Sequence, residues 1–394
     1  MKQKKQYSRR SFLRTASAIS AGVLVSLTGT GFLSACSRND KESSPQAGIL
    51  VTEGKEEPDL EVNLRAVQAE QQIFLGPKTH VWKYEGEVVQ GDKERLQTIP
   101  DSYLGPIFRV KKGQWVRVNL INDVEEETII HWHGLHLSEE MDGHPKYVIQ
   151  PGESYQYDFT VLNRAGTYWY HPHPHAITGP QVFRGLAGFF LVSDDEEQQT
   201  GLPSGEYDIP LVLQDRVVDA NNQWVYLSGG QMERMMGVLG DHILVNGQPN
   251  FTFSAAARPY RLRILNGSNS RIYKLAWEDD TPLTVIGTDG GLLERAVERP
   301  YVMLSPGERV ELWTDFSEKK TGETIRLVSK SFSAGMTGGM MGGMMGGSSS
   351  LANGAPFPIL EVMVDRETSG EALALPDRLS VIERYRLEDA VNGN

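Results

Sequence analysis

The sequence Gln-Trp-Val-Arg-Val-Asn-Leu at residues 114–120 decides the fold class, because apolar and polar side chains alternate along it. A strand points successive side chains to opposite faces, so Val116, Val118 and Leu120 share one face. Residues 155–161, Tyr-Gln-Tyr-Asp-Phe-Thr-Val, repeat the alternation. Both runs are typical of β-strands that bury one face against a core.

Further runs of strand type follow at short intervals, and no segment keeps a 3.6-residue apolar period over three helical turns. These runs are Gly188–Val192, Ile209–Leu213, Arg261–Leu265, Leu283–Ile286, Val310–Trp313 and Ile359–Val364. Turn-forming residues separate them, in a chain with 40 Gly and 20 Pro. Short strands at this spacing predict an all-β protein built as a sandwich or a barrel.

An internal repeat divides the chain in two. The pentapeptides Ile-Gln-Pro-Gly-Glu at 149–153 and Leu-Ser-Pro-Gly-Glu at 304–308 each precede a predicted strand, at similar places in the two parts. The repeat predicts two related β-sandwich domains, at residues 61–195 and 205–366. We place their boundary in the acidic, turn-rich stretch Ser193–Gly205.

The first 36 residues have the composition of an export signal. Residues 8–13, Ser-Arg-Arg-Ser-Phe-Leu, form a twin-arginine sequence, and a modest apolar run diluted by glycine follows from about 16 to 33. The run ends in Leu-Ser-Ala-Cys, which has the form of a lipobox, so Cys36 would be the lipidated first residue of the mature chain. Cleavage nearby without a lipid is the alternative. Residues 37–60 are polar and predict a flexible tether.

This signal predicts export by the twin-arginine route to the periplasm or the cell surface, with a lipid anchor in the membrane. The chain carries 39 basic and 51 acidic residues, a formal charge of −12. The first 36 residues hold six basic and no acidic residues, which leaves 33 basic and 51 acidic, or −18. A nucleic-acid binder needs a basic face, so that class is excluded. A single cysteine also excludes an intramolecular disulfide and any metal site with two thiolates.

Histidines supply the candidate chemistry. Nine occur, seven of them between 131 and 175, and four form two His-x-His pairs: His131 with His133, and His171 with His173. Residues i and i+2 of a strand point to the same side, with Cα atoms roughly 6.6 Å apart, so each pair projects two imidazoles from one face. A lone histidine in a strand is usually an ordinary polar residue, but two such pairs predict metal binding. Copper, zinc and iron all accept imidazole.

The other histidines are less informative. His175 continues the face of His171 and His173, and it would either contact a ligand residue or act as a spare ligand. The neighbouring prolines Pro172 and Pro174 lack a backbone N–H, so this segment should lie at a sheet edge or a strand end. We expect His80, His144 and His242 to be ordinary, and His136 is undecided.

At these residues the sequence resembles the multicopper oxidases, in particular the bacterial cuprous oxidase and bilirubin-oxidase-like branch. The segments His-Trp-His-Gly-Leu at 131–135 and Tyr-His-Pro-His at 170–173 match its first two copper motifs. Further matching segments lie at 141–143, 149–152, 185–188, 265–268 and 287–291. The resemblance covers about residues 60–380. It implies cupredoxin-like Greek-key β-sandwiches, and oxidation of Cu(I), phenols or tetrapyrroles coupled to O₂ reduction.

The resemblance also implies individual roles. His131 would bind the type 2 copper, His133 and His171 one type 3 copper, and His173 the other. Asp142 matches an acid that the family places near the cluster for proton delivery; the alternative is that it only caps a turn.

The sequence departs from the family pattern in its later part. No histidine follows His242 and no cysteine follows Cys36, whereas the family carries four more cluster histidines and a type 1 copper site in a third domain. Residues 367–394, with Leu-Pro-Asp-Arg-Leu at 375–379, resemble the start of the linker to that domain. We therefore expect half of a type 2/type 3 site and no type 1 copper. The chain would be truncated and inactive alone, and a separately encoded third cupredoxin domain would be its partner.

A methionine-rich insertion lies at 336–345, where five of the 12 methionines stand on a glycine-rich backbone. These are Met336, Met340, Met341, Met344 and Met345. Thioethers select Cu(I), so the segment predicts Cu(I) capture, with a plain flexible linker as the alternative.

Three function classes remain open. The first is a copper oxidase, truncated or split. The second is a non-catalytic periplasmic copper-binding or copper-tolerance protein. The third is an inert structural cupredoxin of the cell envelope, against which the four intact His-x-His residues count.

Overall fold

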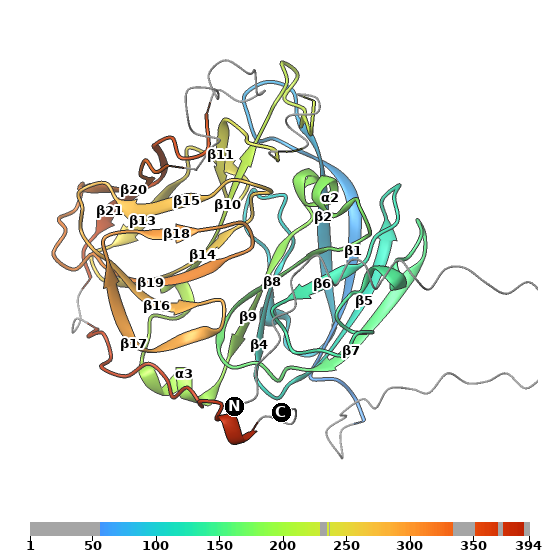
Figure 1. The fold of residues 1–394 in the computed structure, drawn as a ribbon, viewed down its shortest axis with the longest axis horizontal. Coiled ribbons are helices and arrows are strands. Elements are labelled where there is room, and N and C mark those ends of the chain that lie inside the picture. The colour runs from blue at the N-terminus through green and yellow to red at the C-terminus, as the bar shows by residue number, and fades with distance from the viewer. Residues whose placement is uncertain (1–55, 229–234, 236, 334–350, 369–372, 390–394) are drawn as a thin grey trace, which may run out of the picture. The chain divides into compact units, whose positions relative to one another are not determined.

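The computed structural model describes residues 56–228, 235, 237–333, 351–368 and 373–389, and all of them belong to one compact unit, residues 48–394 (Figure 1). The predicted all-β class is confirmed. Within the described ranges, no helix has the length and apolar character needed to cross a membrane. The predicted signal with Cys36 and the methionine-rich insertion lie outside these ranges.

Strands β1 to β9, which we call the N-terminal half, form two sheets with the strand orders β2-β1-β5-β7 and β3-β4-β9-β8-β6. Their bounds are β1 (Leu60–Gln71), β2 (Thr79–Gln90), β3 (Leu96–Gln97), β4 (Ile107–Lys111), β5 (Trp115–Asp123), β6 (Ile130–His133), β7 (Ser154–Thr160), β8 (Gly166–Pro172) and β9 (Gly188–Ser193). The alternating runs of the sequence lie in β5 and β7.

Strands β10 to β21, the C-terminal half, form two more sheets, with the orders β12-β11-β10-β14-β19-β16-β17 and β13-β21-β20-β15-β18. Their bounds are β10 (Asp208–Arg216), β11 (His242–Val245), β12 (Gln248–Pro249), β13 (Thr252–Ala256), β14 (Pro259–Asn266), β15 (Tyr273–Trp277), β16 (Leu283–Thr288), β17 (Gly291–Arg299), β18 (Val302–Leu304), β19 (Arg309–Asp315), β20 (Thr324–Ser329) and β21 (Phe357–Arg366).

The helices described are short. They are α2 (Thr178–Arg184), α3 (Asp195–Thr200) and the 3₁₀ turns η1 (Lys93–Arg95), η2 (Pro145–Tyr147), η3 (Gly205–Tyr207) and η5 (Leu387–Asp389). Helix α3 lies in the stretch where we placed the boundary between domains. The carboxylate of Asp194 accepts a hydrogen bond from the N–H of Glu197 and caps this helix.

The two halves repeat one strand pattern. Strand β1 is parallel to β5 and β5 antiparallel to β7, and β10, β14 and β19 reproduce this arrangement. The two pentapeptides form the same turn: the N–H of Gly152 donates to the carbonyl of Asn122 (2.7 Å), and that of Gly307 to Asn266 (2.8 Å). In the second sheet of each half, β6 beside β8 corresponds to β15 beside β20. The sequence repeat is therefore also a structural one.

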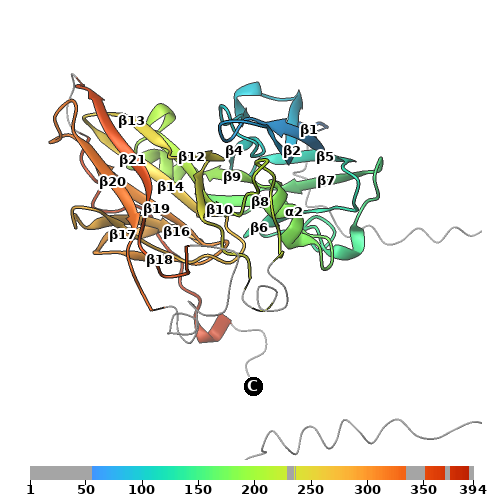
Figure 2. The ribbon, with the colours of Figure 1, turned by 90° about the horizontal axis from the view of Figure 1, so that it is seen from above.

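Each half has its own apolar core, and a third apolar cluster joins them. The cores contain Trp132 and Tyr170 in the N-terminal half, and Tyr260 and Leu312 in the C-terminal half. The joining cluster combines N-terminal residues such as Trp169 with residues of β10, β11 and β14. Figure 2 shows β8 and β9 beside β10. The outer face of the β4-β9-β8 sheet is thus partly covered by the C-terminal half.

Buried ion pairs continue this contact. The network contains Arg109, Glu197, Asp208, Arg261, Arg263 and Glu311. Arg263 Nε lies 2.6 Å from an oxygen of Asp208, and Asp208 also pairs with Arg109 of β4 at 2.9 Å. Glu311 pairs with both Arg261 and Arg263. Three cations thus face three anions where the halves meet.

The segment predicted to begin a linker packs on the C-terminal half over residues 373–381. Leu379 is buried with Leu292 and Trp313, and the hydroxyl of Ser380 donates to the carbonyl of Leu292 (3.2 Å). These residues are therefore part of the folded unit.

Candidate metal centre

Two neighbouring strands present the His-x-His pairs. In the register of β6 and β8, His131 lies opposite His171 and His133 opposite Trp169. The alternate residue Trp132 points into the core, which turns both histidines of β6 to the outer face of the sheet. His173 follows the end of β8, and its N–H donates to the carbonyl of Ile129 (2.8 Å).

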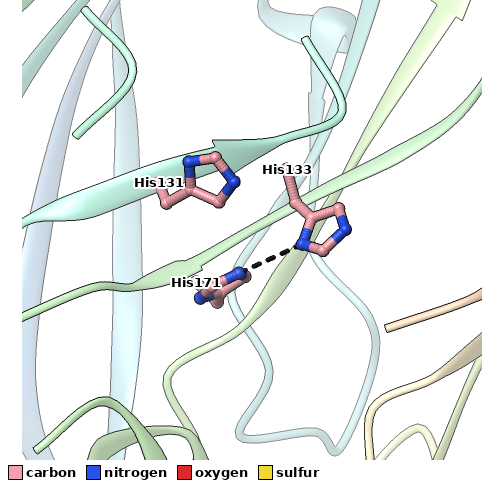
Figure 3. Close-up of side chains that lie close together, drawn as sticks. All are labelled: His131, His133 and His171. Carbon is pink, nitrogen blue, oxygen red and sulfur yellow. Dashed lines mark hydrogen bonds between the residues drawn. The ribbon is translucent and has the colours of Figure 1, made fainter. Parts of the chain in front are cut away.

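The four imidazoles form one cluster. The ring centroids of His131 lie 5.5, 5.3 and 5.4 Å from those of His133, His171 and His173. Those of His133 and His171 are 5.5 Å apart. Figure 3 shows His131 and His133 on one strand and His171 on the next. One nitrogen from each of these three rings lies within 4.8 Å of the others.

Hydrogen bonds leave ring nitrogens free to bind a metal. Nδ1 of His171 lies 2.8 Å from the carbonyl oxygen of Pro172, which only accepts, so this nitrogen carries the hydrogen. Its Nε2 then presents a lone pair, 3.3 Å from Nδ1 of His133 (Figure 3). Nδ1 of His131 donates in the same way to the carbonyl of Asp142 (2.8 Å). Metal-binding histidines usually have such a backbone acceptor on the second ring nitrogen.

Three of the rings favour the neutral form that a metal requires. Burial lowers the pKa of His133 to about 4, with help from the charge of Arg309. Burial also lowers the pKa of His171 and that of His173. Burial alone would lower the pKa of His131, but the carboxylate and carbonyl of Asp142 outweigh it, and this pKa is raised.

Trp169 lies against two of the rings, and sequence reasoning did not identify it. Its ring stacks on His133, with centroids 5.1 Å apart and planes at 29°, and lies 4.3 Å from the ring of His171. The signal was present in the sequence, since Trp169 stands two residues before His171 and therefore on the same strand face.

The remaining candidates are placed as follows. A carboxylate oxygen of Asp142 lies 3.2 Å from Nδ1 of His131, and this side chain is 40% exposed. His175 is exposed, in the turn before α2. The four other histidines are also exposed; they are His80, His136, His144 and His242. Thus the structure brings together the two His-x-His pairs and Asp142.

The cluster fits a bound metal ion. Two facing nitrogens 3.3 Å apart can both reach one ion, because a metal–imidazole bond is about 2.0–2.1 Å long for zinc. Nδ1 of His173 is buried and has no hydrogen-bond partner among the described residues. Imidazole donors suit copper as well as zinc and iron.

Comparison with known proteins points to one family. A family model described as multicopper oxidase matches residues 80–197. The chain is 33% identical to the McoA multicopper oxidase of the hyperthermophile Aquifex aeolicus, with a TM-score of 0.71 over 85% of this chain and 68% of that one.

Two curated proteins are also similar. Multicopper oxidase mco of Staphylococcus epidermidis is 37% identical over 225 residues, 57% of this chain and 49% of that protein. The cell division protein FtsP of Xenorhabdus nematophila is 34% identical over 250 residues, 63% of this chain and 51% of that protein. The chain spans about half the length of these two relatives.

Proposed function

Because this chain belongs to the multicopper oxidase family, we propose that His131, His133, His171 and His173 hold copper and serve the reduction of O₂. The observation that carries the proposal is the convergence of the four imidazoles, with Nδ1 of His133 and Nε2 of His171 only 3.3 Å apart. In this proposal the fold consists of two cupredoxin-like Greek-key sandwiches, at 61–195 and 205–366.

The facing nitrogens support a division of roles. Nδ1 of His133 and Nε2 of His171 would bind the same type 3 copper. His131, the other histidine of β6, would bind the type 2 copper. His173 would bind the second type 3 copper. Copper held at these positions would supply the one-electron redox chemistry for the reduction of O₂ to water.

The chain's own residues orient the ligands and move protons. The carbonyl of Asp142 fixes the tautomer of His131, and its partly exposed carboxylate can exchange protons with water beside the same ring. Trp169 stacks on two of the rings and limits their rotation. We assign Asp142 the delivery of protons and Trp169 the orientation of His133 and His171.

Electrons must enter from elsewhere. A type 1 centre needs a cysteine thiolate, and Cys36 is the one cysteine in the printed sequence. We propose that a further cupredoxin domain supplies this centre and the remaining imidazoles, either from the same gene product or from a separate chain. The residues printed here would then bind copper but turn over phenols, tetrapyrroles or Cu(I) only weakly.

Export and copper capture complete the proposal. Residues 1–36 would direct the folded protein through the twin-arginine route, and Cys36 would anchor it by a lipid in the periplasm or at the cell surface. The thioethers between Met336 and Met345 would gather Cu(I).

Two other functions fit parts of the observations. A non-catalytic copper-binding protein would need only the four imidazoles and the methionine-rich insertion. The similarity to a cell division protein supports a structural role in the envelope. The clustering of the four histidines favours a copper-binding function over a purely structural role in the envelope.

The test is copper reconstitution of the exported chain. With Cu(II), which thioethers do not select, we expect protein-bound copper that is lost when His133 and His171 are both replaced by alanine, and no blue thiolate band. A matched control replaces the exposed His80 and His242 instead. Copper retained by the first variant, or copper absent from the wild type, would contradict the proposed function.

A further inference from the structure

The C-terminal half reaches the outer face of the sheet that carries the histidines. Thr167, Trp169 and His171 alternate along β8 and share this face, since Tyr168 and Tyr170 point into the core. Trp169 lies two residues after Thr167 on this face and stacks on His133, so it links Thr167 to the metal centre. Whatever holds Thr167 therefore sets the position of this end of the cluster.

Arg309 of β19 holds that position. Its Nε donates to the carbonyl of Thr167 (2.9 Å), and its Nη1 donates to the carbonyl of Gly307 (3.0 Å). Nη2 donates to the carbonyl of Asp289 (3.0 Å), and the Asp289 carboxylate pairs with the same guanidinium. The side chain of Arg309 is 3% exposed, so all three nitrogens are engaged in a dry contact.

The same guanidinium lies over the other histidine strand. A Cβ placed on Gly134, the residue after His133, would stand 3.0 Å from Nη2 of Arg309. A Cβ on Gly307, whose carbonyl Arg309 binds, would stand 3.5 Å from Cε1 of His133 and 3.6 Å from Trp169. Arg309 thus contacts the end of β6, and through Gly307 it fixes the turn that lies against the ring of His133.

Glu311 makes a second contact with Thr167. Its Oε1 accepts a hydrogen bond from the hydroxyl of Thr167 (2.6 Å), and it is fully buried between Arg261 and Arg263. Residues 309 and 311 share the outer face of β19, so both project at β8 from one strand. The two contacts fix Thr167 through its backbone and its side chain.

We infer that Arg309 is a positioning residue for the metal centre: it sets the placement of His133 and His171 from the C-terminal half, and its functional meaning rests on the proposed function. The N-terminal half supplies the ligands, and the C-terminal half fixes the spacing between them. The bidentate geometry of a guanidinium suits this task, which the point charge of lysine cannot perform.

The test compares R309K with R109K in the full chain. Both variants shorten an arginine between the halves, buried at 309 and partly exposed at 109, but Arg109 pairs with Asp208 and contacts none of the four histidines. The first readout is the ring ¹⁵N and ¹H shifts of the histidines in metal-free protein. We expect R309K to move the resonances of His133 and His171, and R109K to leave them in place.

A second readout is the Cu(I) affinity of the clustered histidines, followed by their ring resonances, which we expect to fall about tenfold or more in R309K, as for other residues that orient metal ligands. Unmoved resonances in folded R309K, or equal movement in both variants, would overturn the inference. Should R309K not fold, D289N carries the test, because it weakens the same guanidinium contact from a partly exposed side chain. Failure of the wild type to bind copper would refute the proposed function, whereas the metal-free shifts still decide the positioning role.

Discussion

The pair β6–β8 of the N-terminal half and the pair β15–β20 of the C-terminal half occupy the same place in a repeated fold, yet one carries three histidines, with His173 just beyond its end, and the other none. The outward positions of β15 and β20 include Lys274 and Arg326, since Leu275 and Leu327 face the core. Lys274 lies over the ring of Tyr301, and Arg326 pairs with a glutamate. The repeated fold supplies the platform, and outward residues alone decide the chemistry.

The two strand pairs also differ in how deeply their outer faces are buried. Every residue of β8 is buried, because the C-terminal half packs over its outer face. Strand β20 instead alternates between exposed and buried residues over most of its length. The metal centre therefore lies beside a dry contact, where hydrogen bonds and ion pairs can hold its ligands.

The largest loss of stability we predict is for Glu311, on the face of β19 that packs against β8. Replacing Glu311 with alanine removes one of the two carboxylates that pair with both buried Arg261 and Arg263, and leaves Glu197 as the other. Breaking a buried pair from one side costs about 3–5 kcal/mol. The free energy of unfolding from urea titration measures this loss, and a loss below about 1 kcal/mol would show that the network does not stabilise the contact.

Low pH should weaken the network of ion pairs between the two halves. Burial would raise the pKa of Asp208, but Arg263 and Arg261 outweigh it and lower the pKa to about 2. A lowered pKa stabilises the fold above the unfolded value of about 3.9, and this stability is lost as pH falls toward 2. We expect about 2 kcal/mol to be lost in this window. D208N should lose less over the same range, and an equal loss would contradict the assignment.

The repeated turn offers a matched pair of glycine variants. Gly307 has φ +81° and Gly152 has φ +84°, so alanine at either position should cost about 1–2 kcal/mol. Only Gly307 lies against His133 and Trp169, while nothing surrounds a Cβ at Gly152. Histidine ring shifts should therefore change in G307A and not in G152A. Equal spectra in both variants would mean that this turn does not contact the metal centre.

The smallest loss of stability we predict is for a partly exposed ion pair between β20 and β21. Glu361 pairs with Arg326 at 2.9 Å, with side chains 32% and 49% exposed. Exposed pairs contribute about 0–1 kcal/mol, so E361A should unfold at nearly the wild-type urea concentration. A loss comparable to that of E311A would remove the distinction between the two faces.

Much of this could be predicted from the sequence, because it follows from local periodicity. The alternation in residues 114–120 and 155–161 locates β5 and β7, and the two His-x-His pairs identify one face of a sheet. What escaped prediction depends on the other half of the molecule. We placed the domain boundary in the acidic stretch before Gly205, yet Glu197 turns inward because Arg261 and Arg263 are buried opposite it. Contacts across 64 and 66 residues leave no local pattern in the sequence.

The central claim is that the four clustered imidazoles of His131, His133, His171 and His173 hold copper together. Histidine ring NMR during titration with Cu(I) tests it most directly, since five exposed histidines serve as internal controls. We predict that the ring signals of His131, His133, His171 and His173 change together, while those of His80 and His242 stay fixed. If copper instead moved the exposed rings, or left all four clustered rings unchanged, the account would be wrong.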